Sequence, residues 1–131
     1  MAKRKTKPKS PSKQSDPSLS LAHAAIEGIQ EKKGNNVVLI NLKEITTAVC
    51  DYFVICEGNS KTQVEAIADS VEDQIKKKEK TKPWHSEGFG NAEWILLDYG
   101  NVVVHIFQPE TRSFYQLEEL WADGVTQKIP G

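Results

Sequence analysis

The most constraining feature of the sequence is a pair of apolar runs that only two residues separate. The first run covers 94–99 and the second covers 102–107, with Gly100 and Asn101 between them. Both runs are rich in β-branched and aromatic residues, which favour strands. Glycine and asparagine adopt the positive φ angles that a two-residue turn needs. The sequence therefore predicts an antiparallel β-hairpin over 94–107.

Apolar periodicity places the other elements of the fold. Apolar residues at helical spacing predict helices, and short apolar runs between turn residues predict strands. The expected helices cover about 18–33, 61–80 and 111–121, and the other expected strands cover 37–42, 52–56 and 84–87. A strand–helix–strand crossover next to a hairpin requires both parallel and antiparallel pairs. We therefore expect a single α/β domain with a mixed five-stranded sheet flanked by helices.

Charge is distributed unevenly along the chain. The first 16 residues carry six basic side chains and one acidic side chain, which gives a net charge of +5. Since the whole chain has a net charge of −1, the remainder has a net charge of −6. Residues 1–17 contain almost no apolar side chains and are expected to form a disordered basic tail. We expect the domain over 18–123 and a C-terminal tail over 124–131. Because phosphate binding needs a basic face, the acidic domain argues against nucleic-acid binding. Its charge either suits a basic protein partner or only keeps a small domain soluble.

Compartment and cofactor use follow from what the sequence lacks. No apolar run approaches the roughly 20 residues that a membrane-spanning helix needs, and no hydrophobic leader segment stands at the N-terminus. Cys50 and Cys56 fit no metal-binding or redox spacing. We therefore expect a cytoplasmic protein with reduced cysteines, without membrane association and without a metal or cofactor.

Three blocks of the sequence resemble one known family. They are DYFVICEGNS at 51–60 with QV at 63–64 and AIA at 66–68, EWILLDYGNVVVHIF at 93–107, and RSFYQLEELW at 112–121. In these blocks, and over about 19–123, the chain is similar to the Iojap-like ribosome silencing factors (RsfS). Three separate motifs in the same order make this resemblance specific, whereas one short motif would not.

The resemblance implies a nucleotidyltransferase-like fold and a function in translation. Members of this family bind the large ribosomal subunit through its fourteenth protein, at the face where the small subunit docks. They thereby block subunit association and repress translation when nutrients are scarce, and some members form homodimers. The resemblance thus implies a translation repressor that is not an enzyme. The basic N-terminal tail is expected to contact ribosomal RNA weakly at most.

The resemblance also implies a protein-binding site on the hairpin. Trp94 and Tyr99 stand at positions that belong to the ribosomal-protein contact in the family, with Asp98 and Gly100 beside them. Because side chains alternate along a strand, Trp94 and Tyr99 are expected on opposite faces of the sheet. One of them would then face the core and the other a partner. The residues expected to support this site are Asp51, His105, Arg112 and Tyr115.

The alternative function is that of a metal-dependent nucleotidyltransferase-like enzyme. Gly58, Asn59 and Ser60 follow a strand and precede a helix, like the turn with which such enzymes hold a triphosphate. The chemistry also needs two carboxylates spaced Asp-x-Asp to hold metal ions. Here Asp98 is followed two residues later by Gly100. We therefore expect no catalytic residue, and we interpret the turn as a helix start capped by Asn59 or Ser60.

Overall fold

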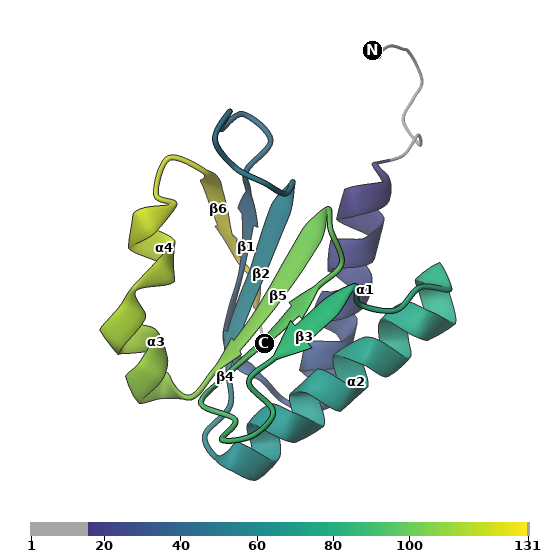
Figure 1. Ribbon diagram of the computed structural model, residues 1–131, viewed down its shortest axis with the longest axis vertical. Coiled ribbons are helices and arrows are strands. Elements are labelled where there is room, and N and C mark those ends of the chain that lie inside the picture. Colours follow the sequence, from purple (N-terminus) through teal and green to yellow (C-terminus); the bar gives the residue numbers. More distant parts are fainter. Residues whose placement is uncertain (1–15, 131) are drawn as a thin grey trace.

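In the computed structural model, which describes residues 16–130, helices lie on both sides of one sheet (Figure 1). The helices are α1 (Pro17–Glu31), α2 (Lys61–Glu79), α3 (Pro109–Tyr115) and α4 (Leu117–Leu120). The strands are β1 (Asn35–Asn41), β2 (Tyr52–Glu57), β3 (His85–Glu87), β4 (Trp94–Asp98), β5 (Val102–Phe107) and β6 (Val125–Lys128). The predicted hairpin is confirmed, because β4 and β5 pair antiparallel and Gly100 and Asn101 form the turn between them.

The strands follow the order β3-β4-β5-β2-β1-β6 across the sheet. β2 and β5 pair in parallel, with Val54 opposite Val104, and the other neighbouring strands pair antiparallel. All residues of β5 are buried, and so are all residues of β2 except Glu57. Strands in this position are covered on both faces, which explains their continuous apolar sequence. The predicted mixed-sheet α/β fold is confirmed.

The sheet has six strands, whereas the sequence predicts five. The additional strand, β6, lies in the segment 124–131 that the sequence analysis assigns to a tail. It pairs antiparallel with β1, and Gln127 stands opposite Leu39. All of its residues are exposed, so it lacks the apolar alternation by which a strand is recognised in a sequence. Backbone pairing with a buried neighbour defines β6, and that neighbour is distant in sequence.

The helix predicted over 111–121 is interrupted at Gln116. This residue has a left-handed backbone with φ 48°, and its N–H donates to the carbonyl of Arg112 at 2.9 Å. The turn ends α3, and α4 starts at the next residue. Leu117 is consequently buried while Leu120 stays exposed. Glutamine is an ordinary helix former, so its residue type does not predict the break.

The helix α1 begins one residue before its predicted start because Asp16 caps it. The Asp16 carboxylate accepts a hydrogen bond from the backbone N–H of Ser18 at 3.0 Å, and Pro17 occupies the first helical position, which favours proline. The same carboxylate accepts from the hydroxyl of Tyr52 at 3.0 Å. Asp16 and Pro17 therefore belong to the domain. The rest of the expected N-terminal tail, residues 1–15, lies outside the described residues.

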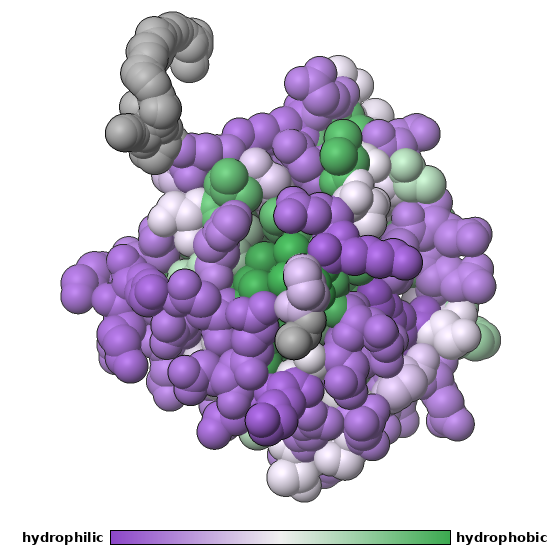
Figure 2. Space-filling view, turned by 180° about the vertical axis from the view of Figure 1, so that it is seen from behind, coloured by the Kyte–Doolittle hydropathy of each residue, from purple (hydrophilic) through white to green (hydrophobic). Residues whose placement is uncertain are grey.

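The helices form two layers around the sheet. α1 and α2 pack side by side on one face, and α3 with α4 lies on the other face (Figure 1). Each face of the sheet therefore has its own apolar layer. Seen from behind, the molecular surface is mainly hydrophilic, with apolar side chains in a central area and in smaller areas around it (Figure 2). Within the part of the chain that the structure describes, no helix is long and apolar enough to cross a membrane.

The backbones of α1 and α2 are in close contact at Gly28. A Cβ atom at this position would lie 2.7 Å from the Cα of Val71 and 2.8 Å from the carbonyl oxygen of Ser70. The hydroxyl of Ser70 donates to the carbonyl of Gly28 at 2.8 Å. Only a residue without a side chain permits this approach, so Gly28 sets the distance between the two helices.

We predict that Gly28→Ala lowers the free energy of unfolding by about 1–3 kcal/mol, because the added methyl group forces the helix backbones apart. The loss should outweigh the higher helix propensity of alanine, which favours it by about 1 kcal/mol. Urea denaturation followed by circular dichroism measures the difference. Gly90→Ala is the matched control, since a Cβ there would meet no atom within 4 Å. Equal stability of the two variants would contradict the tight contact.

Candidate interaction surface

Aromatic side chains gather on the face of the sheet that carries α3 and α4. We define this aromatic face by Phe53, Trp94, His105, Phe107, Tyr115 and Trp121. The ring centroid of Trp94 lies 4.8 Å from that of Phe107 and 4.9 Å from that of Tyr115. Separations in this range are favourable for aromatic pairs. Trp94 therefore stands at the junction between the sheet and α3.

A hydrogen bond across the hairpin fixes the indole ring of Trp94. Its Nε1–H donates to Nδ1 of His105 at 3.1 Å. Because Nδ1 accepts this bond, the neutral imidazole carries its hydrogen on Nε2. Burial lowers the pKa of His105 to about 3, so the ring is neutral near pH 7. Its Nε2 atom has no hydrogen-bond partner among residues 16–130. The bond and the packing together hold Trp94 in one orientation.

Part of this sheet face is left open along β4. Trp94, Leu96 and Asp98 alternate along the strand, and all three are half-buried. The intervening residues Ile95 and Leu97 are fully buried under the opposite layer of helices. β4 thus presents a stripe of two apolar side chains and one carboxylate to solvent.

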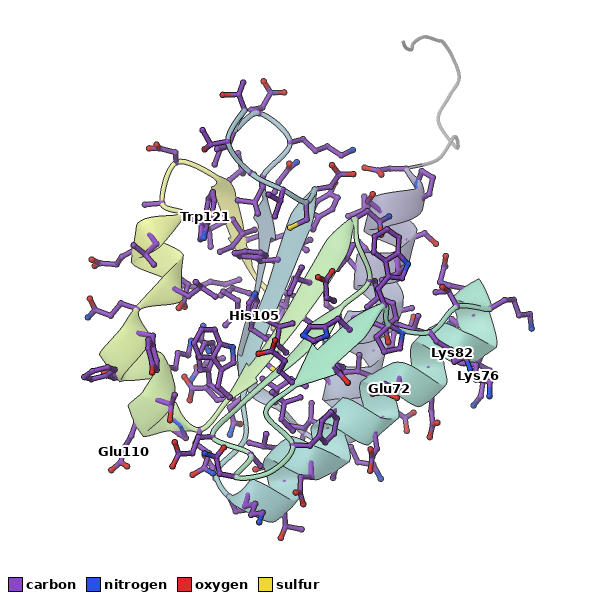
Figure 3. The ribbon with its side chains drawn as sticks, in the orientation of Figure 1. Glu72, Lys76, Lys82, His105, Glu110 and Trp121 are labelled. Atoms are coloured by element: carbon purple, nitrogen blue, oxygen red, sulfur yellow. The ribbon has the colours of Figure 1, made fainter. Side chains whose placement is uncertain are left out.

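The helices α3 and α4 also carry exposed apolar side chains. Phe114 is 80% exposed and Leu120 is 73% exposed. The rings of Phe114 and Tyr115 lie 5.0 Å apart, and Trp121 lies between α4 and the sheet (Figure 3). Exposed apolar groups near a fixed tryptophan are typical of a protein-binding surface.

An open pocket joins the aromatic residues of α3 to carboxylates. Its lining consists of Glu93, Gln108, Glu110, Thr111, Phe114 and Tyr115. Glu110 points outward from the start of α3 (Figure 3). Two carboxylates beside two aromatic rings form an environment that favours a lysine or arginine side chain, through ion pairing and cation–π contact.

Tyr99 lies on the opposite face of the sheet from Trp94, as the alternation along the strand predicts. The residue is only 5% exposed, and its side chain packs in the apolar layer under α1 and α2. Burial raises the pKa of the Tyr99 hydroxyl, whose oxygen has no hydrogen-bond partner in the described part of the chain. The structure therefore places Tyr99 in the core and does not join it with Trp94 in one surface.

Gly100 shapes the hairpin turn beside Asp98. The backbone N–H of Gly100 donates to the Asp98 carboxylate at 2.8 Å, and Gly100 has φ 90°. A Cβ at this position would lie 3.0 Å from the indole ring of Trp84. The missing side chain therefore allows that ring to lie over the turn. Of the two residues, Asp98 belongs to the exposed stripe of β4, whereas Gly100 supports the turn.

Arg112, which the sequence analysis assigns to the site, is a buried tie between elements. Its guanidinium forms ion pairs with Glu57 at 3.1 Å and with Glu118, and it donates to the carbonyl of Asn36 at 2.7 Å. The side chain thus links α3 to β1, β2 and α4. The donors of Arg112 are engaged and only 8% of the residue is exposed. Arg112 therefore stabilises the position of α3, which carries Tyr115 of the aromatic face.

Asp51 also has an internal role. It accepts a hydrogen bond from the hydroxyl of Ser18 at 2.6 Å, and Ser18 accepts from the side chain of Asn101 at 2.8 Å. This network connects the first turn of α1 to the start of β2 and to the hairpin turn. The other two supporting residues, His105 and Tyr115, do belong to the aromatic face.

The turn before α2 is built as a helix start. Ser60 accepts a hydrogen bond from the backbone N–H of Gln63 at 3.0 Å and is the N-cap. The Gln63 side chain reaches back to the N–H of Asn59 at 2.7 Å. Within residues 16–130, no group of three or more His, Cys, Asp or Glu side chains is arranged to hold a metal ion. The predicted capping by Ser60 is confirmed.

Sequence reasoning does not single out Leu96 and Phe114 for the surface. Leu96 carries a usable signal, because it lies two residues from both Trp94 and Asp98 on one strand. Phe114 carries none, since its exposure depends on the helix break at Gln116.

The chain is similar to known proteins along nearly its whole described length. Residues 14–130 match the family described as "Ribosomal silencing factor during starvation". A ribosomal silencing factor from Halalkalibacterium halodurans is 38% identical over 85% of this chain and 93% of its own length. One from Bacillus subtilis is 39% identical over 79% of this chain and 86% of its own length. A crystal structure of a Chromobacterium violaceum protein has a TM-score of 0.75 at 30% identity, covering 86% of this chain and 92% of that one.

We predict that His105 lowers stability at acid pH. Its pKa is near 3 in the folded protein against 6.5 without burial, so the unfolded chain takes up a proton at higher pH. This histidine's contribution to stability is therefore complete above about pH 6.5 and is lost as the pH falls toward 3. In that window the loss approaches roughly 1.4 kcal/mol per pH unit.

Urea denaturation at pH values from 7 to 4 measures this slope. His105→Gln removes the titrating group. The slope of the unfolding free energy against pH should then fall by the equivalent of up to one proton taken up on unfolding. His23→Gln, at an exposed position of α1, is the matched control for replacing a histidine with glutamine. The same slope in the wild type and in His105→Gln would contradict the prediction.

Proposed function

Because the chain belongs to the RsfS family of ribosomal silencing factors, we propose that it binds the large ribosomal subunit through its fourteenth protein and blocks association with the small subunit. It acts in the cytoplasm and represses translation when nutrients are limiting. The mechanism is steric and includes no catalytic step. The starvation in the family's description supports the link to nutrient supply.

The observation that carries this proposal is the open stripe on β4 beside the exposed apolar residues of α3. Trp94 is a suitable anchor, since tryptophan is enriched among the residues that dominate binding energy. Its hydrogen bond to His105 fixes the indole before a partner arrives. A side chain that is already ordered loses little conformational entropy on binding, which favours affinity.

Charge supports a basic ribosomal protein as the partner. Outside the first 16 residues the chain carries −6. Asp98 lies in the stripe, and Glu93 and Glu110 line the pocket next to Phe114. These carboxylates would attract lysine and arginine side chains of the partner, which mainly raises the association rate and makes it sensitive to salt.

Occlusion needs only a stable position at the joining face. An interface of about 1,200–2,000 Å² is sufficient for specific binding, and the stripe, the pocket and α3 together offer one continuous surface. Once the domain is held there, its volume excludes the small subunit.

We predict that Trp94→Ala weakens binding to the large subunit by about 1–4 kcal/mol, because it removes the anchor. Co-sedimentation of the full-length protein with separated large and small subunits, and with both together, measures binding and loss of the joined ribosome. Val125→Ala is the control, since Val125 is an exposed apolar residue on β6 at the far edge of the sheet. Unchanged binding by folded Trp94→Ala would exclude this surface.

We predict that deleting residues 1–13 changes binding to the large subunit less than tenfold, because this segment carries no aromatic anchor. The deletion stops before Asp16, which caps α1 and accepts from Tyr52. A titration by pull-down of large subunits compares the shortened and full chains. A tenfold or greater loss would show that the basic segment contributes to specific binding.

A further inference from the structure

A second surface lies at the C-terminal end of α2, on the side of the sheet away from α3 and α4. It combines exposed lysines with an exposed tryptophan. We define this lysine–tryptophan patch by Lys76, Lys77, Lys80, Lys82 and Trp84. The aromatic face does not include any of these residues, so the patch is a separate feature of the molecule.

Helix geometry and chain length limit how far apart these residues can lie. Lys76 and Lys80 are one turn apart, and the backbone N–H of Lys80 donates to the carbonyl of Lys76 at 3.1 Å. Lys80 then ends the helix in a left-handed conformation. Four residues of extended chain span roughly 14 Å at most, which limits the distance from Lys80 to Trp84. Lys76 and Lys82 lie at the same end of α2 (Figure 3).

The lysines of the patch differ in their surroundings. The ammonium of Lys80 donates to the carbonyl of Lys77 at 3.3 Å, and Lys77 lines an open pocket with Asp69 and Asp73. None of its four lysines forms an ion pair with another residue of the described part, 16–130, whereas the neighbouring Lys78 pairs with Glu27 at 2.7 Å. Lysines in the last turn complement the helix dipole, which accounts for Lys76 and Lys77. That argument does not extend to Lys82 and Trp84, which follow the helix.

Trp84 is held in a fixed place while its ring stays in solvent. Its backbone N–H donates to the carbonyl of Asp98 at 2.8 Å, and its ring lies over Gly100. The residue is nevertheless 80% exposed. An exposed aromatic ring on a rigid backbone, close in the chain to exposed lysines, is the combination with which proteins stack a nucleic-acid base and hold its phosphates.

We propose that the lysine–tryptophan patch binds single-stranded RNA, with Trp84 stacking on a base and the lysines contacting phosphates. The inference rests on the proposed function, because a domain seated on the large ribosomal subunit lies beside RNA as well as protein. The rest of the domain is acidic and would be repelled by phosphate. The patch supplies local positive charge where the overall charge is unfavourable.

The test uses the full chain and a fluorescein-labelled oligouridine of 12 nucleotides, with binding measured by fluorescence anisotropy at several salt concentrations. Trp84→Ala should weaken binding roughly five- to hundredfold, and Trp84→Phe should retain most of it because a phenyl ring also stacks. Lys76→Gln with Lys82→Gln should reduce the slope of log affinity against log salt by roughly 1.4.

The matched control is Lys32→Gln with Lys61→Gln, which removes the same charge from exposed positions outside the patch. The basic segment before Asp16 is identical in all variants and contributes equally. Thermal unfolding by circular dichroism identifies any variant that fails to fold. RNA affinity and salt slope of the patch variants equal to those of the control would overturn the proposal.

Co-sedimentation with the large subunit separates this proposal from the proposed function. Loss of subunit binding by the patch variants, with unchanged oligouridine binding, would show that the patch holds an acidic protein segment and would overturn the RNA assignment. Patch-dependent oligouridine binding by a wild-type protein that does not bind the large subunit would refute the proposed function and leave the RNA assignment supported.

Discussion

The parallel pairing of β2 with β5 is the contact on which the other elements depend. It joins six residue pairs, from Tyr52 opposite Val102 to Glu57 opposite Phe107. Parallel neighbours need a crossover connection, and α2 with the β3–β4 segment provides it. Both strands are buried on both faces, so helices must cover both sides of the sheet. Alternate residues of β5 then serve different layers: Val104 packs under α1 and α2, and His105 stands in the aromatic face.

Local patterns predicted those parts of the fold whose signal lies within one segment. The hairpin follows from two apolar runs around Gly100, and the two long helices follow from their apolar periodicity. The sixth strand and the break at Gln116 have no such signal. β6 is exposed and exists because β1 offers backbone partners from a distant part of the chain. Gln116 adopts a left-handed backbone that tertiary packing, rather than its residue type, selects.

The candidate site was predictable to a similar extent. The family resemblance singles out Trp94 and Asp98, and strand alternation correctly separates Tyr99 from Trp94. The hydrogen bond from Trp94 to His105 depends on the register of the hairpin, in which Leu96 stands opposite His105. This side-chain hydrogen bond could not be predicted from the sequence alone. The role of Arg112 was not predictable either, because its partners come from three other elements. Whether Trp94 binds the ribosomal protein stays a prediction.

The position of β6 has a consequence for the order in which the domain folds. Its partner β1 lies near the start of the domain sequence. On the side of β1 away from β2, Val38 to Asn41 pair only with residues 125–128. Contacts between such distant segments close slowly. Until they form, β1 is an edge strand with unsatisfied backbone groups beside apolar side chains, which is a template for pairing between molecules. A chain cut short before Val125 would keep this edge permanently open and should tend to aggregate.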